Sequence, residues 1–179
     1  MTKTNKKKLS KHNENINKVV CESLQQALII LMNKKKFSEI SITELCKKAG
    51  VSRMAFYNNY ESKDNLLKQL ISYHSEIIIS TIGSPFRKDT NVSWYIKLFE
   101  YAKENHYNLL TIFKAGFKYE YISTMTDIVL HDKDISSNDI YLRLMWVGAI
   151  VNTIIYWLES GMNEPIKDIA IFCFNNLSV

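Results

Sequence analysis

The sequence contains little proline or glycine, with two prolines and five glycines among 179 residues. Because these residues interrupt regular structure, their scarcity favours long, continuous helices. No segment shows the alternation of apolar and polar residues, bounded by tight turns, that predicts paired strands. The hydrophobic share of 46% is that of an ordinary globular protein. We therefore expect an all-α protein of one or two small domains.

Motifs that carry reaction chemistry are also missing. The three cysteines, Cys21, Cys46 and Cys173, form no C-x-x-C pair and lie in apolar surroundings, so we expect reduced, buried thiols. The four histidines are scattered. There is no H-E-x-x-H, no glycine-rich phosphate loop and no G-x-S-x-G. The sequence thus predicts a protein that is not an enzyme and has no metal site and no cofactor.

No apolar signal segment opens the sequence, and the longest apolar run is short. This run, Leu144 to Leu158, is interrupted by Asn152 and Thr153. A membrane-spanning helix needs about 20 apolar residues, so we interpret the run as a buried helix. The expected location is the cytoplasm, without membrane association.

Positive charge is concentrated in the first third of the chain. Residues 1–68 carry 14 Lys and Arg against 6 Asp and Glu, a balance of +8, and residues 69–179 carry 9 against 12, a balance of −3. A basic first part and a slightly acidic remainder indicate that only the first part meets a polyanion. The stretch Thr2 to Lys11 is expected to be a disordered basic tail.

The segment Phe37 to Leu67 predicts two short helices around a glycine turn, followed by a third. Ser41 begins a Ser-x-x-Glu capping box, Gly50 suits a left-handed helix end, and Ser52 and Ser62 are suited to begin the next two helices. A short second helix with polar residues at its tip is typical of proteins that place side chains in a DNA major groove.

The residues of this segment that face outward suit DNA chemically. Arg and Asn pair with guanine and adenine edges, Tyr57 and Lys63 can reach phosphate oxygens, and a helix N-terminus attracts phosphate. A helical hairpin with a solvated polar face would share this spacing. The candidate DNA-binding residues are Ser41, Thr43, Ser52, Arg53, Met54, Ala55, Tyr57, Asn58, Asn59 and Lys63.

Residues 37–67 resemble the signature of the TetR family of bacterial transcriptional regulators. The matching positions are Phe37, Ser41-Ile42, Ala49-Gly50-Val51-Ser52, Phe56-Tyr57, Tyr60 and Ser62-Lys63-Asp64-x-Leu66-Leu67. Met54 and Ala55 stand where the family often has Gly and Thr, and Tyr60 replaces the usual Phe. The body resembles, more loosely, a subgroup of such regulators from low-GC Gram-positive bacteria. The resemblance implies a three-helix helix-turn-helix head and a helical bundle body.

Helical periodicity extends over the remaining chain. We expect the tail at residues 1–11, a DNA-binding head with its connecting helix at residues 12–82, and an effector-binding and dimerisation body at residues 83–179. The predicted helices are His12 to Asn33, Ser41 to Ala49, Arg53 to Asn59, Lys63 to Ile82, Val92 to Glu104, His106 to Lys114, Lys118 to His131, Asp139 to Ser160 and Pro165 to Leu177.

The last two predicted helices are apolar on more than one face. Such helices must be buried on two sides, so we expect a second copy to cover one of them; a monomer with an ordinary core is the alternative. The resemblance implies the same, since TetR-family proteins dimerise through a four-helix interface of these helices. The candidate interface residues are Val147, Val151, Ile154, Ile155, Leu158 and Phe172.

Aromatic residues of the body could line an apolar effector cavity or fill an ordinary core. The candidate pocket residues are Trp94, Phe99, Phe113, Phe117, Tyr121 and Trp146. The favoured interpretation is a homodimeric repressor that a small apolar or aromatic effector releases from a palindromic double-stranded operator. One alternative is a regulator of the same shape that a protein partner controls, or that activates. Another is a helical interaction module without DNA binding.

Overall fold

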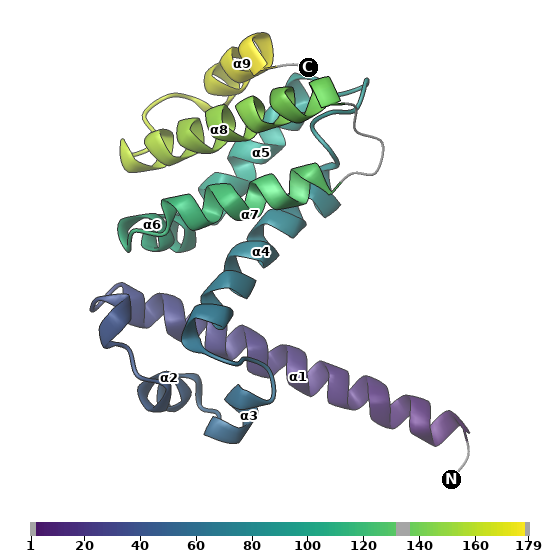
Figure 1. The fold of residues 1–179 in the computed structure, drawn as a ribbon, viewed down its shortest axis with the longest axis vertical. Helices are drawn as coiled ribbons and strands as arrows, with labels where there is room; N and C mark the ends of the chain where they lie inside the picture. Colours follow the sequence, from purple (N-terminus) through teal and green to yellow (C-terminus); the bar gives the residue numbers. More distant parts are fainter. Residues whose placement is uncertain (1–2, 132–136, 178–179) are drawn as a thin grey trace. The chain divides into compact units, whose positions relative to one another are not determined.

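The computed structural model describes the backbone of residues 3–131 and 137–177 and the side chains of residues 15–131 and 139–177. Within these ranges the chain forms nine α-helices, one short 3-10 helix and no strand, which confirms the expected all-α class (Figure 1). Two compact units are present, Met1–Leu70 and Ile71–Val179. Their boundary lies inside α4 (Lys63–Ile82), so this helix belongs to both units.

The first unit is a small helical cluster around one apolar core. Leu24 and Leu28 of α1 are fully buried, as are Leu45, Phe56 and Leu66 from the following helices. Helix α1 packs against both α2 and α3. The elements are α1 (Lys3–Met32), η1 (Phe37–Glu39), α2 (Ile42–Ala49), α3 (Arg53–Tyr57) and the first part of α4.

Helix α1 begins earlier than the sequence pattern indicated. The prediction placed a disordered tail up to Lys11 and a helix from His12, whereas the structure has helix from Lys3 onward. No glycine or proline occurs between Lys3 and Met32, and lysine is a good helix former. Once the apolar part of α1 is anchored, extending the helix toward the N-terminus needs no new nucleation.

The second unit is a bundle with an aromatic core. Trp94 and Trp146 contact edge to face with ring centroids 5.8 Å apart, and Phe99 and Trp157 do so at 5.2 Å. Helices α5 and α6 have the predicted bounds, and α8 begins at Ser137 rather than Asp139. Its elements after α4 are α5 (Val92–Glu104), α6 (His106–Lys114), α7 (Lys118–Leu130), α8 (Ser137–Glu159) and α9 (Ile166–Leu177).

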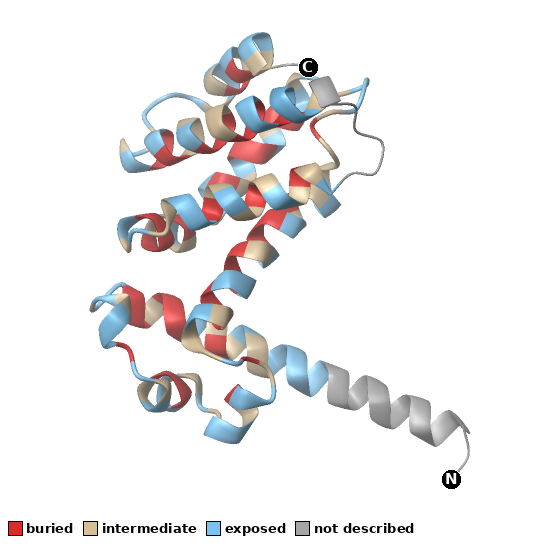
Figure 2. Cartoon of the chain, viewed as in Figure 1, coloured by how far each residue is buried: buried red, intermediate tan, exposed pale blue. Residues whose placement is uncertain are grey.

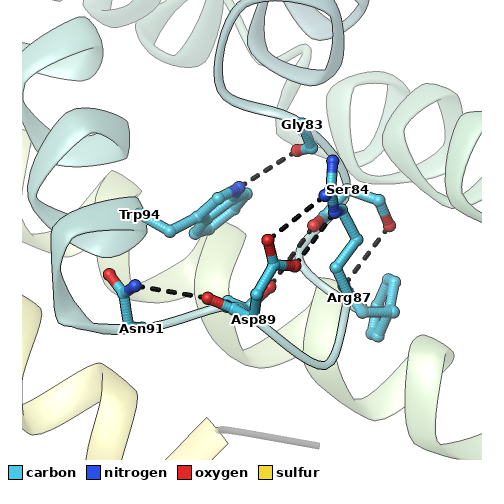
Figure 3. Close-up of polar contacts among 8 residues, drawn as sticks. Gly83, Ser84, Arg87, Asp89, Asn91 and Trp94 are labelled. Carbon is cyan, nitrogen blue, oxygen red and sulfur yellow. Dashed lines mark hydrogen bonds and ion pairs between the residues drawn. The ribbon is translucent and has the colours of Figure 1, made fainter.

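The connection from α4 to α5 is a hydrogen-bonded turn. The Trp94 indole donates to the Gly83 carbonyl at 3.0 Å, and the Arg87 guanidinium pairs with Asp89 at 3.0 and 3.2 Å. Figure 3 shows these contacts. Asn91 then caps α5 by accepting from the Ser93 amide at 2.9 Å. This segment folds as part of the second unit.

Part of α8, Asp139–Glu159, is long and apolar enough to cross a membrane by length and composition alone. In the structure this helix packs against α5, α6, α7 and α9, with buried residues along the side that faces them (Figure 2). Trp146, Val147, Ile150 and Val151 are each 4% exposed or less. The prediction of a buried helix is therefore confirmed for this side.

Candidate nucleic-acid interface

The turn between α2 and α3 is built as the sequence predicted. Gly50 has φ 70° and ψ 26°, a left-handed conformation that costs glycine little. The Val51 amide donates to the Cys46 carbonyl at 3.0 Å, which closes the end of α2. Ser52 then caps α3 by accepting from the Ala55 amide at 3.0 Å. These local bonds fix where α3 begins.

The capping box at the start of α2 is only half formed. Ser41 accepts from the Glu44 amide at 3.2 Å, as predicted. The Glu44 carboxylate does not reach back to the cap; it forms an ion pair with Lys35, in the segment after α1. A charged partner offers a stronger hydrogen bond than a neutral amide. The effect is to tie the start of α2 to the end of α1.

Helix α3 presents one face to solvent and buries the other. Phe56 is fully buried and Tyr60, just beyond the helix, is 2% exposed. On the outer side Met54 is 73% exposed and Tyr57 is 50% exposed. Ser41, Thr43, Ser52, Arg53 and Asn58 are also exposed, whereas Ala55 is half-buried. The structure thus brings most of the predicted DNA-binding residues to the solvent side of α2 and α3.

Arg53 and Tyr57 lie on adjacent turns of α3 and contact each other. The Arg53 guanidinium carbon is 5.9 Å from the centre of the Tyr57 ring, a cation–π arrangement. The Tyr57 ring in turn packs edge to face on Phe56 at 5.3 Å between centroids. The guanidinium thus has an aromatic partner on its own helix before any ligand is present.

Asn59 does not share this outward orientation. Its side-chain amide donates to the Ala55 carbonyl at 2.8 Å and accepts from the Cys21 thiol at 3.4 Å, and the residue is half-buried. The predicted outward position was wrong because Asn59 lies three residues after the buried Phe56, so both residues share one side of the helical turn. Cys21, predicted to be a buried thiol, is half-buried and holds the end of α3 against α1.

The ammonium of Lys63 already makes hydrogen bonds within the first unit. Its ammonium donates to the carbonyl of Phe37 and, at 2.8 Å, to that of Ile40. It lies 4.4 Å from the centre of the Phe37 ring. An ammonium has three donors, so one remains for a phosphate. No local pattern in the sequence predicts this role, because it joins segments more than 20 positions apart.

The predicted pocket residues form a core with almost no free space. The cavity among these helices is about 20 Å³, room for roughly one water molecule. Four of the six candidates line it, namely Trp94, Phe113, Tyr121 and Trp146. Phe99 instead packs on Trp157, and Phe117 stands at the cap of α7. Aromatic side chains fill each other's space here and leave no preformed effector cavity among the predicted pocket residues.

A buried histidine lies beside this core. His74 is 4% exposed, and its Nδ1 is 2.8 Å from the Tyr101 hydroxyl. Burial lowers the pKa of His74 to about 4, so the ring is neutral at physiological pH. Its Nε2 has no hydrogen-bond partner among the described residues. Burial also raises the pKa of Tyr121 to about 12.

Most of the predicted interface residues point into their own unit. Val147, Val151, Ile155 and Leu158 are 1–5% exposed and so cannot contact a second copy. Ile154 is half-buried. Only Phe172, at 63%, is well exposed. The large apolar side chains that α8 does expose are different ones: Ile140, Tyr141, Leu142, Leu144, Met145 and Tyr156.

A known protein family matches part of the first unit. Residues 26–70 match the model of a family described as bacterial regulatory proteins, tetR family. This match covers the end of α1, the whole of α2 and α3, and the start of α4. No curated protein sequence matches the chain.

Solved structures with the same fold cover nearly the whole chain. A TetR transcriptional regulator from Streptococcus agalactiae 2603V has 17% identity and a TM-score of 0.61, covering 95% of this chain and 99% of its own. The dihydroxyacetone kinase operon activator DhaS has 18% identity and a TM-score of 0.59, with coverages of 88% and 93%. A tetR-family regulator from Streptomyces coelicolor has 14% identity and a TM-score of 0.58, with coverages of 88% and 78%.

The family match falls on the residues that form the capped turn and the exposed face of α3, and the fold of the whole chain is that of these regulators. The chain therefore carries, at residues 26–70, the helix-turn-helix region of the tetR family of bacterial regulatory proteins, and its fold is shared with TetR-family transcriptional regulators.

Proposed function

We propose that this protein binds a palindromic operator as a homodimer and represses transcription, with α3 as the reading helix. The observation that carries the proposal is the outer face of α3, where Arg53, Met54, Tyr57 and Asn58 are exposed on a helix fixed by two caps. The +8 balance of residues 1–68 supports attraction to phosphate. A dimer suits this function because two reading helices about 34 Å apart meet successive major grooves.

The dimer interface in this proposal lies on the exposed sides of α8 and α9. Tyr141, Met145 and Tyr156 are 70–71% exposed and Phe172 is 63% exposed. Residues 141, 145 and 156 lie along one side of α8, since they are separated by four and eleven residues. Gly148 has no heavy atom of a neighbour within 4 Å of the place a Cβ would take, so a second helix can approach closely there.

Control by a small apolar effector is the finer part of the proposal. An effector would enter the aromatic core of the second unit and favour one tilt of α4, because a ligand that binds two states equally shifts neither. A coupling of about 1–3 kcal/mol would lower DNA affinity roughly 5–150-fold. Since the cavity is only about 20 Å³, the effector would have to displace aromatic side chains on entering.

A second candidate, control by a protein partner or action as an activator, is favoured by that filled core. A regulator whose aromatic core holds no ligand needs another molecule, such as a protein partner, that binds its two states with different affinity. DhaS, one of the structures with this fold, is described as an operon activator. A screen of apolar compounds, read by release of bound DNA, separates the two: release favours the effector, and consistent failure favours the partner.

The experiment for DNA binding uses the full chain and a library of random duplexes. We expect enrichment of a palindrome and a log–log dependence of affinity on salt with a slope of about −0.9 for each phosphate contact. A chain that enriches no sequence and shows no salt-dependent binding would instead be a helical interaction module. The cytoplasm, where the operator is, is the proposed location.

A further inference from the structure

The outer face of α3 has an apolar residue at its centre. Successive residues of an α-helix are about 100° apart around its axis. Positions 54 and 58 are therefore each about 160° from position 56, and they lie close together on the face away from it. Phe56 is fully buried. Met54 and Asn58 therefore occupy the side of α3 directly away from the core, the side that enters deepest into a groove.

Met54 differs from its neighbours on this face in its chemistry. It is 73% exposed, against 50% for Tyr57, and its thioether side chain carries no hydrogen-bond donor. It cannot pair with guanine or adenine edges, as Arg53 and Asn58 can. Single exposed apolar residues are common on protein surfaces, so the position of Met54, and not its exposure alone, is informative.

We propose that Met54 is a specificity-determining residue that reads the C5-methyl group of a thymine in each operator half-site; this inference rests on the proposed DNA-binding function. Among the four bases, only thymine presents a methyl group in the major groove, and apolar side chains recognise it by contact. A flexible methionine adapts its shape to such a contact. Arg53 and Asn58 select bases at other operator positions through hydrogen bonds, whereas Met54 distinguishes thymine from the other bases through its methyl group.

Deoxyuridine provides a direct test, because it differs from thymidine only by the absence of this methyl group. The operator selected from random duplexes is remade with each thymine replaced in turn by deoxyuridine, and affinities are measured at constant salt. For the wild-type chain we expect one position in each half-site at which the replacement weakens binding about fourfold, the effect of one buried methyl or methylene group. Met54→Ala should bind the thymine and deoxyuridine operators equally well.

Met54→Leu is the matched control, since it retains an apolar side chain of similar size and should remain sensitive to the same replacement. Circular dichroism should show all three proteins equally folded, because Met54 makes no core contact. The inference is overturned if the wild-type chain tolerates deoxyuridine at every thymine, or if Met54→Ala keeps the wild-type sensitivity. Failure to select any operator would overturn the proposed function itself, and so is distinguishable from both outcomes.

Discussion

The Nζ atom of Lys63 lies 2.8 Å from the carbonyl oxygen of Ile40, across a separation of 23 residues. This bond, with the one to the Phe37 carbonyl, attaches the N-terminus of α4 to the turn before α2. Lys63 is half-buried, so water replaces these bonds only in part once the ammonium is removed. A residue with a predicted role in DNA binding therefore also holds the first unit together.

Lys63→Ala should reduce the free energy of unfolding by about 1–3 kcal/mol, the range for hydrogen bonds to a charged group and for carbonyls left unpaired. It should also weaken binding to all DNA sequences alike. Urea unfolding and binding titrations measure the two effects. Lys68→Ala, which removes an exposed lysine from the same helix, is the control and should leave stability unchanged within about 0.5 kcal/mol. Equal stability of the two variants would contradict a structural role for Lys63.

Arg53→Ala should relax base preference at one operator position and cost about 1–3 kcal/mol of binding free energy. Arg53→Lys should not restore the preference, because lysine lacks the planar fork that pairs with guanine. Binding to a set of operators with single base changes measures this. A uniform loss across all operators would indicate that Arg53 contacts phosphate only.

A negative charge on the exposed side of α8 should disrupt the dimer without unfolding the chain. Tyr156→Glu and Met145→Glu place it at positions that are each 71% exposed, where a second copy would desolvate it. We expect folded monomers in sedimentation analysis. Tyr119→Glu, at a 77% exposed residue of α7, is the control and should remain dimeric. A wild-type chain that is monomeric at tens of micromolar, roughly where stable interfaces are occupied, would refute the proposed interface.

Stability should fall as pH drops from about 6.5 to about 4, the interval between the ordinary pKa of histidine and that of buried His74. In this interval His74 binds a proton in the unfolded chain but not in the folded chain, so a lower pH favours unfolding. Above this interval His74 is neutral in both states and does not change the stability. The loss between about pH 7 and pH 5 should be about 2 kcal/mol. Urea unfolding at both values measures it, and His74→Gln should reduce the difference. An unchanged slope in that variant would assign the pH dependence to other groups.

Local features of the fold could be predicted because single residues determine them. Ser41, Gly50 and Ser52 mark the ends of the short helices α2 and α3, and Ser62 accepts a hydrogen bond from the Asn65 amide at the start of α4. These ends could be predicted because capping and left-handed conformations depend on few neighbours. The outward orientation of Arg53 and Tyr57 followed from the buried position of Phe56.

Features that depend on packing partners could not be predicted in the same way. Helix α8 is apolar on two sides, so periodicity did not show which side faced its own unit. Val151, a predicted interface residue, is buried, and Tyr156, which was not predicted, is exposed. The aromatic residues near Trp146 suited a cavity or a core equally well by composition. Lys63 looked solvated because no local pattern reveals that a distant carbonyl, that of Ile40, lies within its reach.

All three tryptophans of the chain, Trp94, Trp146 and Trp157, belong to the second unit and are 1–7% exposed. Intrinsic tryptophan emission is thus a reporter of that unit alone, and residues 1–70 contribute none of it. During unfolding, a blue-shifted emission that persists while helical circular dichroism declines would reveal that the first unit melts separately. When DNA is added, a change in this emission would report a response of the second unit, which shares α4 with the first.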